Sequence, residues 1–167
     1  AGCSDSQTNE APAAKPTFSN PVIYADYSDP DVIRSGDSYY MVSSSFHLSP
    51  GLPILRSKDL VNWSIVSHVL PTLTFAAEYD RVGGRYGGGP WAPSIREYDG
   101  RFYVYWATPH EGIFMASALQ PEGPWTEPVT VIAEAGLEDP CPLWDDDGTA
   151  WLVHSRVGAG PLILHRM

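Results

Sequence analysis

The sequence contains no apolar run approaching the roughly 20 residues of a membrane-spanning helix, and no long stretch has helical periodicity. Its 10 lysine and arginine residues form no cluster and are outnumbered by 20 acidic residues. Because binding to phosphates needs clustered cations, we expect no nucleic-acid partner. The net charge of −10 suits a neutral ligand such as a sugar, although a solvated surface is the commoner reason for such a charge.

Two common hydrolase signatures are also absent. The chain has no Gly-x-Ser-x-Gly motif and no His-Glu-x-x-His motif, and its five histidines lack metal-ligand spacing. The acidic run at residues 145–147, followed by Gly148, predicts a tight hairpin turn in register with other Asp-Gly turns. A structural calcium ion is the alternative for this run, but nothing else in the segment supports it. We therefore expect no cofactor.

The chain has only two cysteines, and they have different contexts. Cys141 lies between two prolines and is expected to be a small buried thiol. Cys3 follows Ala1-Gly2, which resembles the end of a bacterial lipoprotein signal, where the cysteine is lipidated; a chance tripeptide is the alternative. We expect residues 1–19 to be a lipoprotein-like N-terminus and flexible tether. The protein would then lie outside the cytoplasm, in the periplasm or at the cell surface, with membrane contact only through this anchor.

A pattern of short motifs occurs three times along the rest of the chain. Each copy begins with a proline-containing strand start, at residues 28–34, 93–96 and 139–143. Each continues through a Gly-Asp or Asp-Gly turn into an aromatic strand, and the first two turns are 63 residues apart. A repeat of this length built from short strands indicates the blades of a β-propeller.

Segments rich in aromatic and β-branched residues, separated by turn residues, predict an all-β meander with four strands per unit. The expected strands are residues 32–34, 39–44, 53–57, 64–70, 94–98, 102–107, 113–118, 129–132, 143–144, 150–155 and 162–166. The third unit is about half complete at the last residue. Because a propeller needs about four to eight blades, either several copies associate or the chain is the N-terminal part of a longer protein. We favour the second interpretation.

Carboxylates and aromatic residues are the remaining candidates for chemistry, and together they are typical of glycoside hydrolysis. Asp29 and Asp139 occupy equivalent repeat positions, each directly before a proline. The first strand of each propeller blade lines the central axis, so these carboxylates can converge on one pocket. The alternative is that each Asp-Pro only starts a turn.

The glycine-rich loop at residues 82–90 leads into Trp91 and another strand, whereas a nucleotide-binding loop must open a helix. This loop either lets Trp91 approach a ligand or is a slack connection between blades.

Several ordered motifs together resemble glycoside hydrolase family 43. They lie at residues 20–22, 50–54, 91–96, 123–125 and 138–142, and the resemblance extends from about Asn20 to the last residue. It implies that residues 20–167 are the N-terminal part of a five-bladed β-propeller catalytic domain, roughly its first two and a half blades. It also implies an inverting glycosidase, a β-xylosidase or α-L-arabinofuranosidase. The implied substrate is an oligosaccharide from arabinose- or xylose-containing plant polysaccharides.

The resemblance implies roles for four residues. Asp29 matches the general base, and Asp139 matches the aspartate that orients the general acid and raises its pKa. Phe46 and Trp91 match aromatic walls of the sugar pocket. Asp31 is the rival of Asp29, but only Asp29 lies at the family's distance from the paired tyrosines at residues 39–40.

The general acid of the family, a glutamate, follows the auxiliary aspartate in a later blade, so we expect it beyond residue 167. Glu111 and Glu122 both precede Asp139, and neither is assigned this role. The alternative function is a non-catalytic surface glycan-binding lipoprotein. The presence of both Asp29 and Asp139 argues against it, because binding alone does not require two carboxylates.

Overall fold

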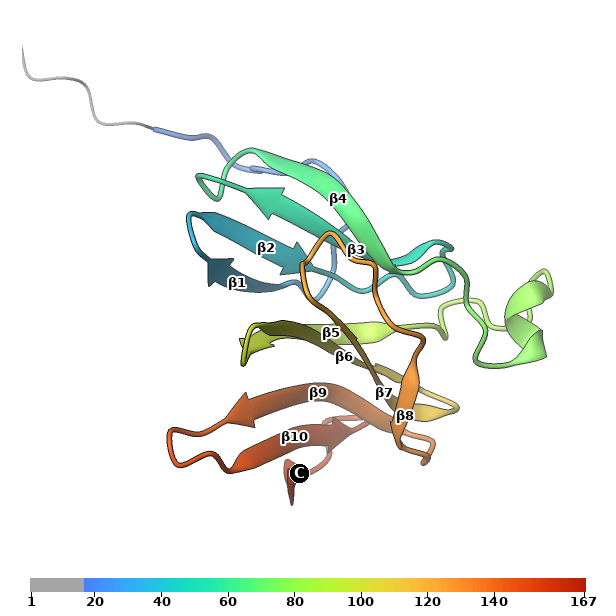
Figure 1. Cartoon of the computed structure of the whole chain (residues 1–167). Coiled ribbons are helices and arrows are strands. Elements are labelled where there is room, and N and C mark those ends of the chain that lie inside the picture. Colours follow the sequence, from blue (N-terminus) through green and yellow to red (C-terminus); the bar gives the residue numbers. More distant parts are fainter. Residues whose placement is uncertain (1–16) are drawn as a thin grey trace, which may run out of the picture.

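The computed structural model describes residues 17–167, which form three antiparallel sheets lying one beside the next (Figure 1). The first sheet contains β1 (Asp31–Ser35), β2 (Ser38–Val42), β3 (Gly51–Ser57) and β4 (Trp63–Leu70). The second contains β5 (Trp91–Tyr98), β6 (Arg101–Thr108), β7 (Gly112–Ala118) and β8 (Val129–Ile132). The third contains β9 (Leu137–Trp144), β10 (Ala150–Arg156) and β11 (Ile163–Arg166). Each sheet is a meander, as the repeat predicts. Cys3 and its neighbours lie outside the described residues, so the lipid anchor stays a prediction.

Two features differ from the sequence-based expectation. The strand expected at residues 143–144 begins much earlier, at Leu137, and contains Pro140 and Pro142. A 3-10 helix, η1 (Ala77–Asp80), lies in the connection between the first two sheets, where no helix is expected from the sequence. The connection that carries η1 projects from the side of the molecule on which β5 begins (Figure 1).

Local chemistry explains the tight hairpins. Asp99 and Gly100, which join β5 to β6, both have positive φ, at 49° and 70°. A two-residue turn of this kind matches the twist of the strands, and Asp-Gly is one of the pairs that tolerate it. The turn fixes the register in which Tyr98 pairs with Arg101 and Ile95 pairs with Val104.

The core lies between the sheets. One cluster packs buried residues of the first sheet, such as Val42 and Ile54, against Ile95 and Trp106 of the second. A second cluster packs the second sheet against the third; its buried members are Tyr105, Ala107, Ile113, Leu137 and Leu152. Burial of these apolar faces stabilises the stacking of the sheets by roughly 25 cal/mol for each Å² removed from water.

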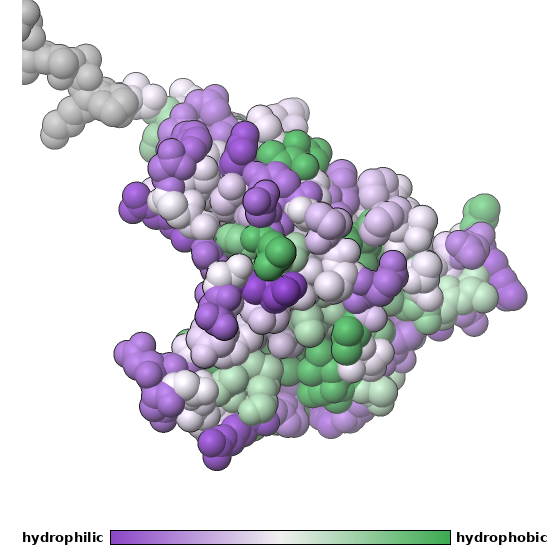
Figure 2. Space-filling view, viewed as in Figure 1, coloured by the Kyte–Doolittle hydropathy of each residue, from purple (hydrophilic) through white to green (hydrophobic). Residues whose placement is uncertain are grey.

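Strand β5 contacts both β1 and β9, so these three strands form the inner row of the assembly. Hydrogen bonds from the N–H of Ala92 to Ser44 and from the Ser94 hydroxyl to the carbonyl of Pro140 bring the beginnings of the three repeats to neighbouring positions. The surface is largely polar and is hollowed on one side between the first sheet and the β9–β10 hairpin (Figure 2). No helix within residues 17–167 is long and apolar enough to cross a membrane.

Candidate active site

The inner strands begin with the same unusual backbone conformation. Asp29, Ala92 and Asp139 each precede a proline, and their φ angles are 48°, 35° and 56°. Positive φ is uncommon for residues other than glycine, and such strain persists only where the surrounding structure holds it, often at functional sites. The equivalence of Asp29 and Asp139 therefore extends from the sequence to the backbone, and Ala92 is the corresponding residue of the second sheet.

Asp29 is held by a buried serine that the sequence analysis did not single out. The Ser44 hydroxyl donates to Asp29 Oδ2 at 2.7 Å, and the backbone N–H of Ala92 donates to Ser44 Oγ at 2.8 Å. The backbone N–H of Ser44 also donates to the carbonyl of Ser28 at 3.0 Å. Ser44 is 6% exposed, whereas Asp29 is exposed to solvent. The carboxylate is thus anchored on one side and accessible to water.

Asp139 lies near Asp29 in the inner row, although 110 positions separate them in the sequence. Partial burial raises the pKa of the Asp139 carboxyl above its ordinary value, and the negative charges of Glu138 and Asp29 raise it further. The effect of Asp29 shows that the first and third sheets bring the two carboxyl groups within electrostatic reach of one another. Two acids with a shared environment are a common arrangement in hydrolytic sites.

Asp31, the rival of Asp29, is engaged in a contact between sheets. Its carboxylate forms an ion pair with the Arg96 guanidinium and accepts the backbone N–H of Ile95 at 2.8 Å. Arg96 also donates to the thiol of Cys141 at 2.9 Å, so it connects all three inner strands. Cys141 is half-buried rather than fully buried. These contacts give Asp31 a structural role that leaves Asp29 as the accessible carboxylate.

Phe46 follows Ser44 by two positions, and Trp91 directly precedes Ala92, which contacts Ser44. The glycine-rich loop is hydrogen-bonded to both aromatic residues. Phe46 has a φ of 51°, and its N–H donates to the carbonyl of Pro90 at 3.2 Å. The indole N–H of Trp91 donates to the carbonyl of Gly87 at 2.7 Å. Both aromatic residues are half-buried. The loop is therefore not a slack connection; it is hydrogen-bonded to the segments that carry the two candidate pocket walls.

Gly89 is the point at which this loop approaches Phe46 most closely. A Cβ atom at Gly89 would lie 1.5 Å from the Phe46 carbonyl oxygen, whereas one at Gly88 would have its nearest neighbours at 3.4 Å. We expect Gly89→Ala to destabilise the fold by about 2–3 kcal/mol, as overpacking does, and Gly88→Ala to have a much smaller effect. The measurement is the midpoint of thermal unfolding of both variants beside the parent. Equal midpoints for the two variants would show that the loop does not pack on Phe46.

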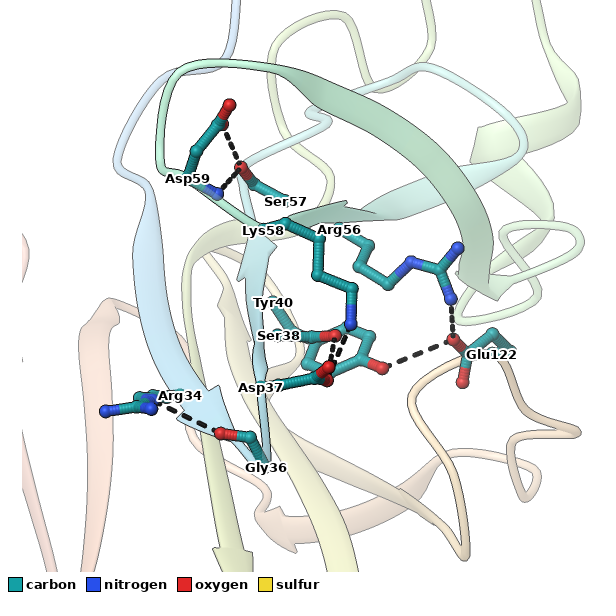
Figure 3. A network of polar contacts seen from close by, with 10 residues as sticks. All are labelled: Arg34, Gly36, Asp37, Ser38, Tyr40, Arg56, Ser57, Lys58, Asp59 and Glu122. Atoms are coloured by element: carbon teal, nitrogen blue, oxygen red, sulfur yellow. Dashed lines mark hydrogen bonds and ion pairs between the residues drawn. The ribbon is translucent and has the colours of Figure 1, made fainter. Parts of the chain in front are cut away.

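The two glutamates left unassigned in the sequence form other contacts. Glu122 accepts hydrogen bonds from the Tyr40 hydroxyl at 3.4 Å and from Arg56 at 3.3 Å (Figure 3). Glu111 accepts from the Tyr79 hydroxyl at 3.1 Å and pairs with Arg85 at 3.4 Å. Glu122 connects a loop to the strands β2 and β3, whereas Glu111 connects the β6–β7 turn to the segment that carries η1 and the glycine-rich loop. Neither contact gives a reason to move the acid assignment.

The acidic run that could suggest calcium forms a hydrogen-bonded turn. The Asp145 carboxylate accepts the N–H of Asp146 at 2.8 Å, and the Asp147 carboxylate accepts the N–H of Thr149 at 2.7 Å. The bond from Thr149 lowers the pKa of Asp147. No group of three or more potential metal ligands comes together within residues 17–167. The turn's own backbone therefore accounts for these carboxylates.

The stacked antiparallel sheets, with aspartates at equivalent starts of the first and third inner strands, correspond to blades of the β-propeller glycoside hydrolases. The sequence model of the glycosyl hydrolases family 43 matches residues 18–167, and the chain belongs to that family. The resemblance found in the sequence is thereby confirmed.

Individual relatives agree with this assignment. A beta-xylosidase of Formosa agariphila is 42% identical over 134 residues, which cover 78% of this chain and 22% of that protein. A non-reducing end alpha-L-arabinofuranosidase of Bacteroides ovatus is 40% identical over 124 residues, covering 71% of this chain and 23% of the relative. The solved structure of GH43B from the Bacteroides ovatus xyloglucan PUL has a TM-score of 0.74 at 34% identity, covering 90% of this chain and 29% of that one. The chain thus spans less than a third of the length of these relatives, and its sheets correspond to part of their propeller.

Proposed function

We propose that the protein is an exo-acting, inverting glycosidase that releases xylosyl or arabinofuranosyl residues from plant-derived oligosaccharides. The observation that carries the proposal is the approach of Asp29 and Asp139 at equivalent strand starts of the first and third sheets, where the charge of Asp29 raises the pKa of Asp139. Family membership and the names of the relatives, a beta-xylosidase and an alpha-L-arabinofuranosidase, support the same chemistry.

In this mechanism Asp29 is the general base. It takes a proton from a water molecule as that water attacks the anomeric carbon, and the leaving oxygen receives a proton from a glutamic acid. We infer that this acid comes from the part of the propeller that the relatives have beyond the region matched here. Inversion places the base and the acid about 6.5–9.5 Å apart, which leaves room for the water.

Asp139 and the aromatic residues then have supporting roles. A negative charge on Asp139 near the acid disfavours ionisation of that acid, so the acid stays protonated at a higher pH. Phe46 and Trp91 present ring faces on which the C–H faces of a sugar can stack. Their attachment to the glycine-rich loop keeps both walls at fixed positions.

The experiment that tests the proposal is hydrolysis of an aryl β-xyloside and an aryl α-L-arabinofuranoside by the complete native gene product, followed by proton NMR from the first turnovers. We expect α-xylose from the first substrate or β-arabinofuranose from the second, before mutarotation. Products of retained configuration would exclude Asp29 as a base acting on water. Binding of xylo- or arabino-oligosaccharides without any hydrolysis would instead support the glycan-binding alternative.

We also propose a location outside the cytoplasm, with a lipid anchor at Cys3. The support is the Ala1-Gly2-Cys3 sequence and the polar tract that follows it. More than one acyl chain is needed for stable anchoring, because each buried CH₂ contributes only about 0.8 kcal/mol. Recovery of the native precursor and its Cys3→Ser variant in the same soluble fraction would contradict this proposal.

A further inference from the structure

We propose that Ser44 is a positioning residue for the general base, and that it fixes which oxygen of Asp29 takes the proton from water. This inference rests on the proposed function and adds a residue to it. Ser44 does not touch the reacting atoms; it acts through Asp29, to which its hydroxyl donates at 2.7 Å.

The direction of this hydrogen bond is fixed by the second partner of the hydroxyl. The N–H of Ala92 can only donate, so Ser44 Oγ accepts from it, at 2.8 Å. A serine hydroxyl has a single proton, and Asp29 Oδ2 is the acceptor within reach of it. Because Ser44 is 6% exposed, competition from solvent for that proton is weak. Ser44 therefore donates to the carboxylate, and its geometry is held by a backbone group.

The consequence for Asp29 is a defined orientation. One carboxylate oxygen is occupied by Ser44, which leaves the other oxygen as the proton acceptor. Asp29 precedes β1 and has a strained φ of 48°, so the strand pairing of β1 does not fix its conformation. The N–H of Ser44 bonds to the carbonyl of Ser28 at 3.0 Å, so Ser44 ties down the backbone beside Asp29 as well as its side chain.

The arrangement also assigns a role to the one repeat that lacks a carboxylate. Ala92 occupies the position of Asp29 in the second sheet and also has a positive φ, of 35°. The Ala92 side chain has no carboxyl group, but its N–H donates to the Ser44 hydroxyl, which in turn donates to Asp29. These contacts fix the position of Asp29, in the first sheet, relative to the second sheet. The first residue of the second sheet is Trp91, a proposed wall of the sugar pocket.

The contact is specific to the base rather than a general property of the repeat. Counted from the pairs Asp31–Val42 and Cys141–Val153, Ser155 of the third sheet corresponds to Ser44 of the first, but a bulge after Val153 pairs Ser155 with Glu138. The single hydroxyl proton of Ser155 has two acceptors within reach, the Glu138 carboxylate at 3.3 Å and the carbonyl of Arg156 at 3.1 Å. Within residues 17–167 no serine donates to Asp139, so the two corresponding serines have different partners.

The test compares three variants of the complete native gene product on an aryl pentoside. We expect Ser44→Ala to lower kcat by about 10²-fold, the scale of a loss of orientation, with KM within about threefold of the parent. Ser44→Thr keeps the hydroxyl and should recover kcat to within about fivefold of the parent. The matched control is Ser43→Ala, because Ser43 is fully buried but bonds only weakly, at 3.4 Å, to a neighbouring carbonyl; its kcat should stay within about twofold.

The outcomes separate this inference from the proposed function. If Asp29→Asn retains turnover, the assignment of the base is wrong, whatever the serine variants do. If Asp29→Asn is inactive but Ser44→Ala turns over like Ser43→Ala, the positioning role alone is overturned. A thermal midpoint measured for each variant distinguishes lost folding from lost orientation. If Ser44→Ala unfolds at a lower temperature than the parent, Ser44→Thr provides the test, because it keeps the hydroxyl. A Ser44→Thr variant that folds normally but loses tenfold or more in kcat would also overturn the positioning role.

Discussion

Replacing Asp29 with asparagine should lower kcat by about 10³-fold or more, while folding and sugar binding persist. An amide keeps the shape of the carboxyl group but cannot take a proton from water, and general base catalysis is typically worth about 10²–10⁴ in rate. The Ser44 hydroxyl can still donate to the amide oxygen, so the anchoring contact survives the substitution. The measurement is kcat on aryl xyloside and aryl arabinofuranoside, together with the affinity for the free sugar, which should change less than about threefold.

Asp31→Asn is the matched control, because Asp31 lies two positions away and is the alternative base. Its carboxylate pairs with Arg96 and accepts the N–H of Ile95. Loss of a charge-assisted bond in this partly buried contact should cost about 1–2 kcal/mol of folding stability, with turnover largely retained. The reverse pattern, with Asp29→Asn within tenfold of the parent and Asp31→Asn inactive, would transfer the base role to Asp31.

The strands were predictable because their local chemistry agrees with the fold. Aromatic and β-branched runs between Asp-Gly turns gave all eleven strands, with small differences at most ends. The exception is β9, where Pro140 and Pro142 concealed the first half of the strand. Proline lacks an N–H and is tolerated at a sheet edge, and β9 is an edge strand of its sheet. Pro93 of β5, also an edge strand, has the same explanation.

The candidate site was predictable only where it follows the repeat. The Asp-Pro motifs and the propeller arrangement together predicted that Asp29 and Asp139 can converge on one pocket. The contact of Ser44 with Asp29 and Ala92 joins residues 15 and 48 positions apart, and no local pattern encodes those pairings. The signal that could have found Ser44 is the run of three serines directly after an apolar strand, because buried hydroxyl groups require partners.

Asp139→Asn should have two separate effects, one on catalysis and one on stability. Without a negative charge beside it, the general acid ionises at lower pH, so the basic limb of the pH–rate profile should move downward and turnover should fall by about 10²-fold. The substitution should have the opposite effect on folding stability, which it should increase at neutral pH. Partial burial, Glu138 and Asp29 raise the pKa of Asp139, so folding favours its protonated form. That stabilisation is complete below the unfolded-state pKa and is lost as pH rises through the raised folded-state pKa.

Asparagine stays neutral at every pH, so the thermal midpoint of the variant should gain on that of the parent as pH rises from about 4 to 7. Because Asp139 is largely exposed, we expect this gain to be small. Glu138→Gln is the matched control: it removes the adjacent charge but keeps Asp139, and the amide oxygen can still accept from Ser155. Its turnover should stay within about threefold of the parent. If Asp139 raises the rate at a cost in folding stability, Asp139→Asn must show both the lower turnover and the higher thermal midpoint. If Asp139→Asn leaves the basic limb where it was and resembles Glu138→Gln in turnover, Asp139 only shapes the start of its strand.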